Sequence, residues 1–333
     1  KYEPLILCAL DGDYPRKLRG HGINIYLQRL SPWSKATSYF KRIADTKNLL
    51  SFVKQQEPDL IHCSYVWFNR YAEIAAENLN IPFITHIRAP LSRRNISKYH
   101  CANSDHIIAV SPKIYNSLIS CGIPESKISL IYDSIDTSEF KKLPPENNFF
   151  VDNFKYHIGI ASRIERSKYQ LQFLNAAAAL LKKRTDTAFL IIGDPHDKAY
   201  AAKLSNFVSK NNMNNHVHFL GKRNDMPRVL NNLDILVTLS GGSVMYEAMA
   251  CGVPVISAGF TKPQDAVHVI HQKTGILVHD HDPRNLSHAM DLLLSNPDLA
   301  SSISKNASER ANTYLSKEIS LKKTQDIYKR LVQ

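Results

Sequence analysis

The segment between residues 234 and 256 constrains the fold of this chain more than any other. It contains an apolar run, a glycine pair, a helix-forming stretch and a second apolar run, in this order: 234–239 (DILVTL), Gly241-Gly242, 243–251 (SVMYEAMAC) and, after Gly252, 253–256 (VPVI). A strand, a tight turn, a short helix and another strand in close succession are typical of a parallel α/β layer. Because glycine lacks a side chain, the turn can bring its backbone close to a ligand.

The start of the helix after this turn has the chemistry of a phosphate site. Its first backbone N–H groups have no partner within the helix, and the positive end of the helix dipole favours an anion. We therefore expect Gly241, Gly242, Ser243 and Val244 to bind a phosphate or diphosphate, with Ser243 also capping the helix. Glu247 lies one turn further on, where its carboxylate can accept hydrogen bonds from sugar hydroxyls. The alternative is a strand-to-helix turn without a ligand, which any parallel α/β protein can contain.

Apolar strands and amphipathic helices alternate along the whole chain, which predicts parallel α/β layers. Strands are expected at 4–10, 24–27, 59–64, 82–86, 105–110, 128–132, 156–161, 188–193, 217–220, 234–239, 253–256 and 275–279, and the main helices at 40–57, 69–79, 112–121, 168–183, 197–211 and 316–332. A chain of 333 residues also exceeds the size at which a single hydrophobic core stops growing. The sequence therefore predicts two α/β domains.

The boundary between these domains is expected at residues 141–154 (KKLPPENNFFVDNF), which mix charges, prolines and asparagines. This places one α/β domain at 1–145 and another at 150–315. The resemblance described below implies that the first is a Rossmann-like acceptor domain and the second a nucleotide-sugar-binding domain. The last helix, within 316–333, is expected to return to the N-terminal domain, as the resemblance below implies.

Residues 247–256 (EAMACGVPVI) carry a specific resemblance. The segment is similar to the nucleotide-binding signature of the retaining GT-B glycosyltransferases of glycosyltransferase family 4. Other motifs of that family match in the same order along the chain: His86, Ser111, Asp136, Arg163, Lys168, 190–194 (LIIGD), 218–221 (HFLG) and 225–227 (DMP). The resemblance implies an α/β fold of the GT-B type, with two Rossmann-like parallel α/β domains facing across a cleft.

The same resemblance implies a function and a set of site residues. A sugar would pass from a UDP- or GDP-sugar donor, with retention, to a glycan or lipid-linked acceptor in bacterial envelope polysaccharide synthesis. Catalytic roles fall on four residues, with Arg163 and Lys168 stabilising the diphosphate, Glu247 orienting the ribose and His86 positioning the sugar or acceptor. Donor binding is expected at Gly193, Lys222, Arg223, Gly241, Gly242, Ser243, Val244 and Glu247. No cofactor other than the donor, and no metal, is implied.

The chain departs from the family pattern at three places. Leu239 stands where the family has a glutamate that helps to hold the donor sugar, and Tyr169 stands where a glycine usually follows the lysine. Family members also begin with a strand, a glycine-rich loop and a helix before the segment that matches 5–10, so we expect this N-terminal domain to lack or replace that unit. These departures leave an alternative open: a non-catalytic GT-B protein that binds a nucleotide sugar or partners an active glycosyltransferase. A sugar-nucleotide epimerase on the same fold is a third possibility.

Two Asp-x-Asp pairs, Asp11–Asp13 and Asp280–Asp282, resemble the metal-binding pair of the other large glycosyltransferase fold. Neither lies in the sequence context of that fold, so we expect no metal site.

The net charge of +12 is spread over both halves, which argues against a nucleic-acid partner. A local cluster of basic or titratable side chains, Arg88, Arg93, Arg94, Lys98 and His100, is either a solvated loop or a contact for an anionic acceptor or lipid headgroups. Without a signal peptide, a long apolar run or paired cysteines, the sequence predicts a cytoplasmic protein, with possible peripheral contact at the inner membrane.

Overall fold

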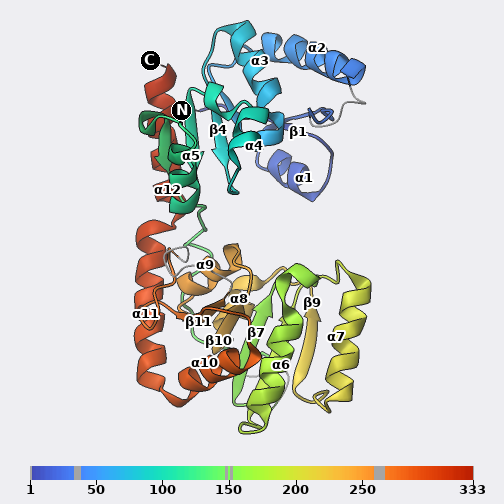
Figure 1. The fold of residues 1–333 in the computed structure, drawn as a ribbon, viewed down its shortest axis with the longest axis vertical. Coiled ribbons are helices and arrows are strands. Elements are labelled where there is room, and N and C mark those ends of the chain that lie inside the picture. The colour runs from blue at the N-terminus through green and yellow to red at the C-terminus, as the bar shows by residue number, and fades with distance from the viewer. Residues whose placement is uncertain (1, 34–38, 147–148, 151–152, 259–266, 333) are drawn as a thin grey trace. The chain divides into compact units, whose positions relative to one another are not determined.

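The computed structural model describes residues 2–33, 39–146, 149–150, 153–258 and 267–332. The chain forms two compact units (Figure 1). The first unit contains Lys1–Ile131 and Lys322–Gln333, and the second unit contains Tyr132–Leu321.

The first unit is built on two parallel sheets. The larger has the strand order β3-β4-β5-β6, and the smaller consists of β1 and β2 alone. The strands are β1 (Leu5–Cys8), β2 (Asn24–Leu27), β3 (Ile61–Cys63), β4 (Phe83–Ile87), β5 (His106–Ala109) and β6 (Ile128–Leu130). The helices are α1 (Asp13–Gly20), α2 (Tyr39–Gln56), α3 (Asn69–Leu79), α4 (Arg93–Lys98) and α5 (Pro112–Ser120), with short 3-10 turns at Val66–Phe68, Cys101–Asn103 and Glu125–Lys127.

The described strands of the second unit form one parallel sheet of order β12-β11-β10-β7-β8-β9. Figure 1 labels β7, β9, β10 and β11 of this sheet. Its strands are β7 (Tyr156–Ala161), β8 (Thr187–Ile192), β9 (Val217–Gly221), β10 (Ile235–Thr238), β11 (Val255–Ala258) and β12 (Ile276–Val278). Its helices are α6 (Gln170–Leu181), α7 (Lys198–Lys210), α8 (Met226–Asn231), α9 (Ser243–Ala250), α10 (Pro283–Ser295) and α11 (Pro297–Tyr314), and α12 (Lys317–Val332) begins here and ends in the first unit. This is the doubly wound order of a Rossmann domain, in which the strand order reverses between β7 and β10.

Alternation along the strands of the second unit fills a core on each face of the sheet. Val237 faces the cluster that contains Phe173 of α6 and Leu286 of α10. Its neighbour Leu236 faces the other cluster, which contains Met249 of α9 and other residues of α8 and α11. Because both faces are covered by helices, these strands are mostly apolar, as the sequence indicates.

Most expected elements are present, and several ends follow the expected local chemistry. Ser111 caps α5 by accepting a hydrogen bond from the Ile114 N–H at 3.3 Å, and Pro112 occupies the first turn. The sequence did not indicate α1, because its apolar positions are few, and the Gly-His-Gly at 20–22 forms the end of that helix.

Two expectations at helix starts were wrong. α6 begins at Gln170 and not at residue 168, because Tyr169 has left-handed backbone angles (φ 60°). Ser243 does not cap α9, because the cap position falls on Gly242.

Candidate functional site

The candidate site of the second unit lies at the carboxyl ends of β7 and β10. These two strands pair directly, with Ile235 opposite Ile158. In a doubly wound sheet, ligands bind outside the carboxyl ends of the strands at the point where the strand order reverses. Arg163 follows β7, and the Gly241-Gly242 turn follows β10, so the topology brings these expected residues to the same edge of the sheet.

The glycine turn leaves the start of α9 open. Gly241 and Gly242 have φ values of 67° and 124°, which are unfavourable for residues with a side chain. A Cβ added at either residue would meet no described atom within 4 Å, so these glycines are required by backbone conformation and not by packing. Within the described ranges, no side chain caps α9. Its first N–H groups, at Ser243 and Val244, are therefore suited to bind an anion.

Glu247 lies one turn into α9 and is partly buried. Burial raises the pKa of its carboxyl group, and a hydrogen bond from the Ser243 side chain opposes this shift. Ser243 therefore contacts the carboxylate that was expected to bind the ribose.

The loop between β7 and α6 holds the two expected cations. Arg163 has a side chain 61% exposed, and its Nη2 lies 3.5 Å from Oε1 of Glu165. The amide of Gln170 donates to Ser162 Oγ at 3.0 Å and to the Arg163 carbonyl at 2.9 Å, which fixes the loop backbone. Lys168 ends the 3-10 turn Arg166–Lys168 and is partly exposed. Both cations are therefore accessible on a backbone that the fold holds in place.

Gly193 has a packing requirement of its own. A Cβ at this residue would lie 2.0 Å from the Ser162 carbonyl oxygen, and its φ is 141°. The backbone at the end of β8 thus passes directly against the loop that carries Arg163. This close approach requires glycine whether or not Gly193 contacts a donor.

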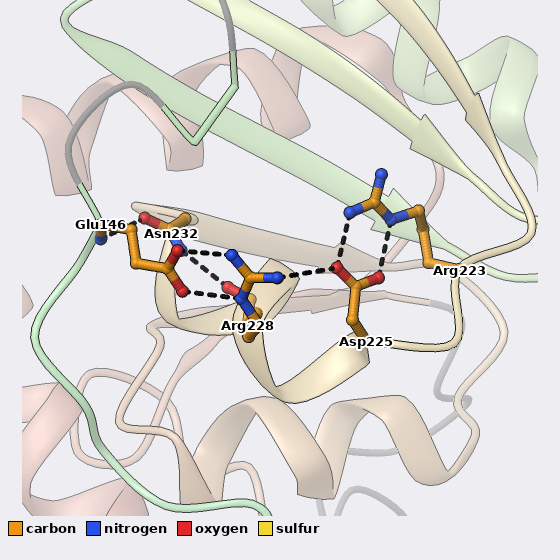
Figure 2. A network of polar contacts seen from close by, with 5 residues as sticks. All are labelled: Glu146, Arg223, Asp225, Arg228 and Asn232. Atoms are coloured by element: carbon orange, nitrogen blue, oxygen red, sulfur yellow. Dashed lines mark hydrogen bonds and ion pairs between the residues drawn. The ribbon is translucent and has the colours of Figure 1, made fainter.

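Arg223 and its neighbour Lys222 follow β9, and Arg223 belongs to a polar network (Figure 2). Its Nε and Nη2 donate to the two carboxylate oxygens of Asp225 at 2.8 and 2.6 Å. Arg228 donates to Glu146 from the same network, and Asn232 accepts from the Glu146 N–H at 2.7 Å. Figure 2 shows that these side chains join the segment before the second sheet to α8. Lys222 is exposed.

Leu239, at the position of the missing glutamate, points into the core. Its residue is 2% exposed and belongs to the same cluster as Val237. The side chain therefore closes the buried end of β10 and does not face a ligand.

His86 lies in the first unit, near the carboxyl end of β4. Its Nδ1 is 3.2 Å from Nη2 of Arg88. Since a guanidinium can only donate, Nδ1 accepts and the proton sits on Nε2. Nε2 is buried, and no described residue is its partner. Burial lowers the pKa of His86 to about 3, with the charge of Arg88 acting in the same direction.

Sequence reasoning missed the residues around His86. His62 of β3 stacks beside it with ring centroids 5.5 Å apart, and His62 Nδ1 lies 2.5 Å from the Tyr328 hydroxyl of α12. The available signal was a polar residue between Ile61 and Cys63 in an otherwise apolar strand.

Asp11, Asp282 and His100, which were also singled out in the sequence, have partners within the protein. Asp11 accepts from Arg19 at 3.0 Å, and Asp282 caps α10 by accepting from the Arg284 N–H at 2.8 Å. His100 lies 3.1 Å from the carboxylate of Glu73 and is partly buried, whereas Arg93 of the same basic cluster is exposed. Across the described ranges, no group of three or more potential ligands could hold a metal ion. Likewise, no described helix is both long and apolar enough to cross a membrane.

Comparison with known families covers both units. The model described as Glycosyltransferase Family 4 matches residues 1–139, and the model described as Glycosyl transferases group 1 matches residues 146–310.

Three proteins illustrate the similarity. The crystal structure of Anabaena Alr3699/HepE in complex with UDP has a TM-score of 0.85 at 22% identity, covering 98% of this chain and 92% of that chain. The uncharacterized glycosyltransferase MJ1178 of Methanocaldococcus jannaschii is 27% identical over 276 residues, which are 78% of this chain and 72% of that protein. The N-acetyl-alpha-D-glucosaminyl L-malate synthase of Bacillus anthracis is 25% identical over 236 residues, 68% of this chain and 60% of that protein.

The two family models between them match both units, and the relative MJ1178 is named a glycosyltransferase. The chain belongs to the group 1 glycosyltransferases of glycosyltransferase family 4 and has their GT-B fold.

Proposed function

We propose that this glycosyltransferase takes its sugar from a nucleoside diphosphate sugar and that the nucleotide is UDP. One observation carries the proposal: the uncapped start of α9 and the loop with the exposed Arg163 and the partly exposed Lys168 follow two adjacent strands, β10 and β7, at the strand-order reversal of the second unit. Backbone N–H groups with an Arg and a Lys are the donors that a diphosphate requires. The similarity to Alr3699/HepE, solved with UDP, supports UDP over GDP.

In the proposed reaction, the bond between the anomeric carbon and the β-phosphate oxygen breaks, and its electron pair leaves with UDP. Arg163, Lys168 and the N–H groups of Ser243 and Val244 stabilise this charge as it develops. The acceptor hydroxyl bonds to the anomeric carbon on the face that UDP leaves, and its proton passes to the departing phosphate. The configuration is thereby retained. These groups offset the charge without a metal ion.

Two further residues position the substrates in this proposal. Glu247 accepts hydrogen bonds from the ribose hydroxyls. His86, whose buried Nε2–H has no partner among the described residues, positions the sugar or the acceptor. The donor binds to residues 150–315 and the acceptor to residues 1–145, with the helix in 316–333 returning to the N-terminal domain.

The proposed acceptor is an anionic glycan or lipid-linked sugar of the bacterial envelope. The exposed cations Arg93, Arg94 and Lys98 support an anionic group, which they would attract electrostatically. The Bacillus anthracis relative is named N-acetyl-alpha-D-glucosaminyl L-malate synthase, and L-malate is an anion, which agrees with this choice. The enzyme would act in the cytoplasm, with peripheral contact at the membrane.

A donor panel tests the proposal. Purified enzyme is incubated with UDP-glucose, UDP-N-acetylglucosamine and GDP-mannose, with and without an extract of lipid-linked and soluble glycans, and nucleotide release is measured. Acceptor-dependent release of UDP, with an α-linked product by NMR, is the expected result. Release of GDP alone would overturn the choice of nucleotide. Turnover without any acceptor would indicate an epimerase or a hydrolase.

A further inference from the structure

Two aromatic rings are stacked beside the glycine turn of the second unit. The centroids of Tyr169 and His281 are 3.9 Å apart, and their planes differ by 12°. Tyr169 directly follows Lys168, and His281 lies in the loop between β12 and α10. Neither side chain has a role in the reaction proposed above.

The position of His281 is fixed by the backbone of β10. Its Nε2 lies 2.7 Å from the carbonyl oxygen of Leu239. A carbonyl only accepts, so Nε2 carries a proton, and in the tautomer protonated at Nε2 the Nδ1 atom has a lone pair that can accept a hydrogen bond. The ring is partly exposed, and within the described parts of the chain no hydrogen bond to Nδ1 is formed.

Tyr169 maintains this stack from an unusual backbone conformation. Its φ of 60° is in the left-handed region, where glycine is favoured and aromatic residues are uncommon. Strained residues of this kind persist where the surrounding structure holds them, often at functional sites. A glycine at this position would remove the strain but also the ring under His281.

The stacked pair is connected to both elements that are proposed to hold the diphosphate. It adjoins Lys168 in sequence, and its hydrogen bond reaches Leu239, two residues before Gly241. A donor sugar is attached to the β-phosphate, so it must lie next to those elements. The Leu239 side chain is buried and cannot contribute. An aromatic stack with an available hydrogen-bond acceptor is well suited to a polar, hydroxylated ring.

We propose that His281 binds the donor sugar, with Nδ1 accepting a hydrogen bond from a sugar hydroxyl, and that Tyr169 is the positioning residue that holds the imidazole. This inference rests on the proposed function of the second unit. It assigns sugar recognition to an imidazole nitrogen on the β12–α10 loop, in a chain that lacks the carboxylate expected at residue 239.

Two substitutions of His281 separate sugar binding from a structural role. In His281→Gln, the amide reaches the place of Nε2 and can still donate to the Leu239 carbonyl, but no acceptor remains at the place of Nδ1. In His281→Asn, the shorter amide puts an oxygen near the place of Nδ1. The matched control is His279→Ala, an exposed histidine two residues earlier in the same loop.

The test compares affinities for UDP and for the donor that wild-type enzyme uses fastest in the panel, by calorimetry and by KM. His281→Gln should raise the Kd and KM for the donor about tenfold, the effect of one lost hydrogen bond, while the Kd for UDP and the Tm stay near wild type. His281→Asn should lose less donor affinity than His281→Gln, and His279→Ala none. If His281→Gln retains the donor affinity of wild type, or if its affinity for UDP falls as much as its affinity for the donor, the proposal is overturned.

Two variants of Tyr169 test its positioning role. Tyr169→Phe keeps the stack and should keep donor affinity. Tyr169→Gly should lower the affinity for the donor about as much as His281→Gln does. Its Tm should stay the same or rise, since glycine relieves the backbone strain. Unchanged donor affinity in Tyr169→Gly would contradict a positioning role. A wild-type enzyme that binds neither UDP nor any donor would overturn the proposed function itself, which is a different outcome from a selective change in these variants.

Discussion

Arg163 is a charged side chain that the fold does not require, since it is 61% exposed and its nearest carboxylate oxygen is 3.5 Å away. Arg163→Ala and Lys168→Ala are each expected to lower kcat/KM for the donor by about 100-fold or more, because charge on the leaving diphosphate is no longer offset. The free energy of unfolding should change by less than about 0.5 kcal/mol, as for other surface substitutions.

Arg166 supplies the control for this prediction. It lies in the same loop, its side chain is 78% exposed, and it forms a long ion pair of 3.8 Å with Asp197. Arg166→Ala should leave donor turnover near wild type. Near-normal turnover in Arg163→Ala or Lys168→Ala would remove that residue from the diphosphate site.

Glu247 tests the ribose contact. Glu247→Gln replaces a carboxylate, whose two oxygens can accept from two hydroxyls, by an amide with one acceptor oxygen. We expect the Kd for UDP to rise about tenfold in calorimetry at neutral pH. An unchanged Kd with unchanged Tm would place Glu247 outside the nucleotide site. Glu139→Gln is the control for charge alone, because Glu139 acts on Glu247 through its charge.

At single positions, the sequence could indicate candidate site residues but not the neighbours of their side chains. It predicted that Arg163 and Lys168 bind the diphosphate, and the structure places both residues on the accessible loop after β7, which leaves their role a prediction. It could not show that a Cβ at Gly193 would meet the Ser162 carbonyl, or that Arg223 donates to Asp225, because those neighbours depend on tertiary packing. The stack of Tyr169 on His281 joins residues more than a hundred positions apart and left no local pattern.

The contact of α12 with the sheet of the first unit predicts sensitivity to acid. Tyr328 contacts His62, and Arg330 lies 3.2 Å from Nδ1 of His106. Burial lowers the pKa of His62 to about 4, of His86 to about 3 and of His106 to about 4, from 6.5. Protonation of these histidines therefore favours the unfolded chain. The free energy of unfolding is highest above pH 6.5 as far as these groups are concerned, and it falls as the pH decreases from 6.5 towards 4. Each histidine lowers the free energy of unfolding by up to about 1.4 kcal/mol for each pH unit of this decrease.

Fluorescence can isolate this effect, because both tryptophans, Trp33 and Trp67, lie in the first unit. Urea unfolding followed by tryptophan emission should show a lower free energy of unfolding at pH 5.5 than at pH 7.5. His106→Gln should reduce the dependence on pH by removing one titrating group. Equal stability at the two pH values would show that these imidazoles do not titrate as buried groups.

Elements with strong local signals were predicted well, and those defined by backbone angles were not. The Ser111-Pro112 pair fixed the start of α5, and the apolar strands of the second unit match the observed ones closely. The starts of α6 and α9 differ because Tyr169 and Gly242 have backbone angles that residue type alone does not reveal.

At the scale of the whole molecule, alternating strands and helices and one signature segment were enough to predict two parallel α/β domains of the GT-B type. The family models and solved structures confirm that fold. The sequence did not indicate that β1 and β2 form a sheet apart from β3–β6. Parallel strands are joined by long crossover segments, so which strands pair is decided by tertiary packing and not by the local sequence.

The central claim is that the edge of the second sheet at β7 and β10 binds the diphosphate of a UDP-sugar. A crystal structure of the full chain with UDP measures this directly. The account predicts the diphosphate within hydrogen-bond distance of the Ser243 and Val244 N–H groups, with Arg163 and Lys168 beside it and the ribose at Glu247. UDP bound at another place, with this edge empty, would contradict the claim.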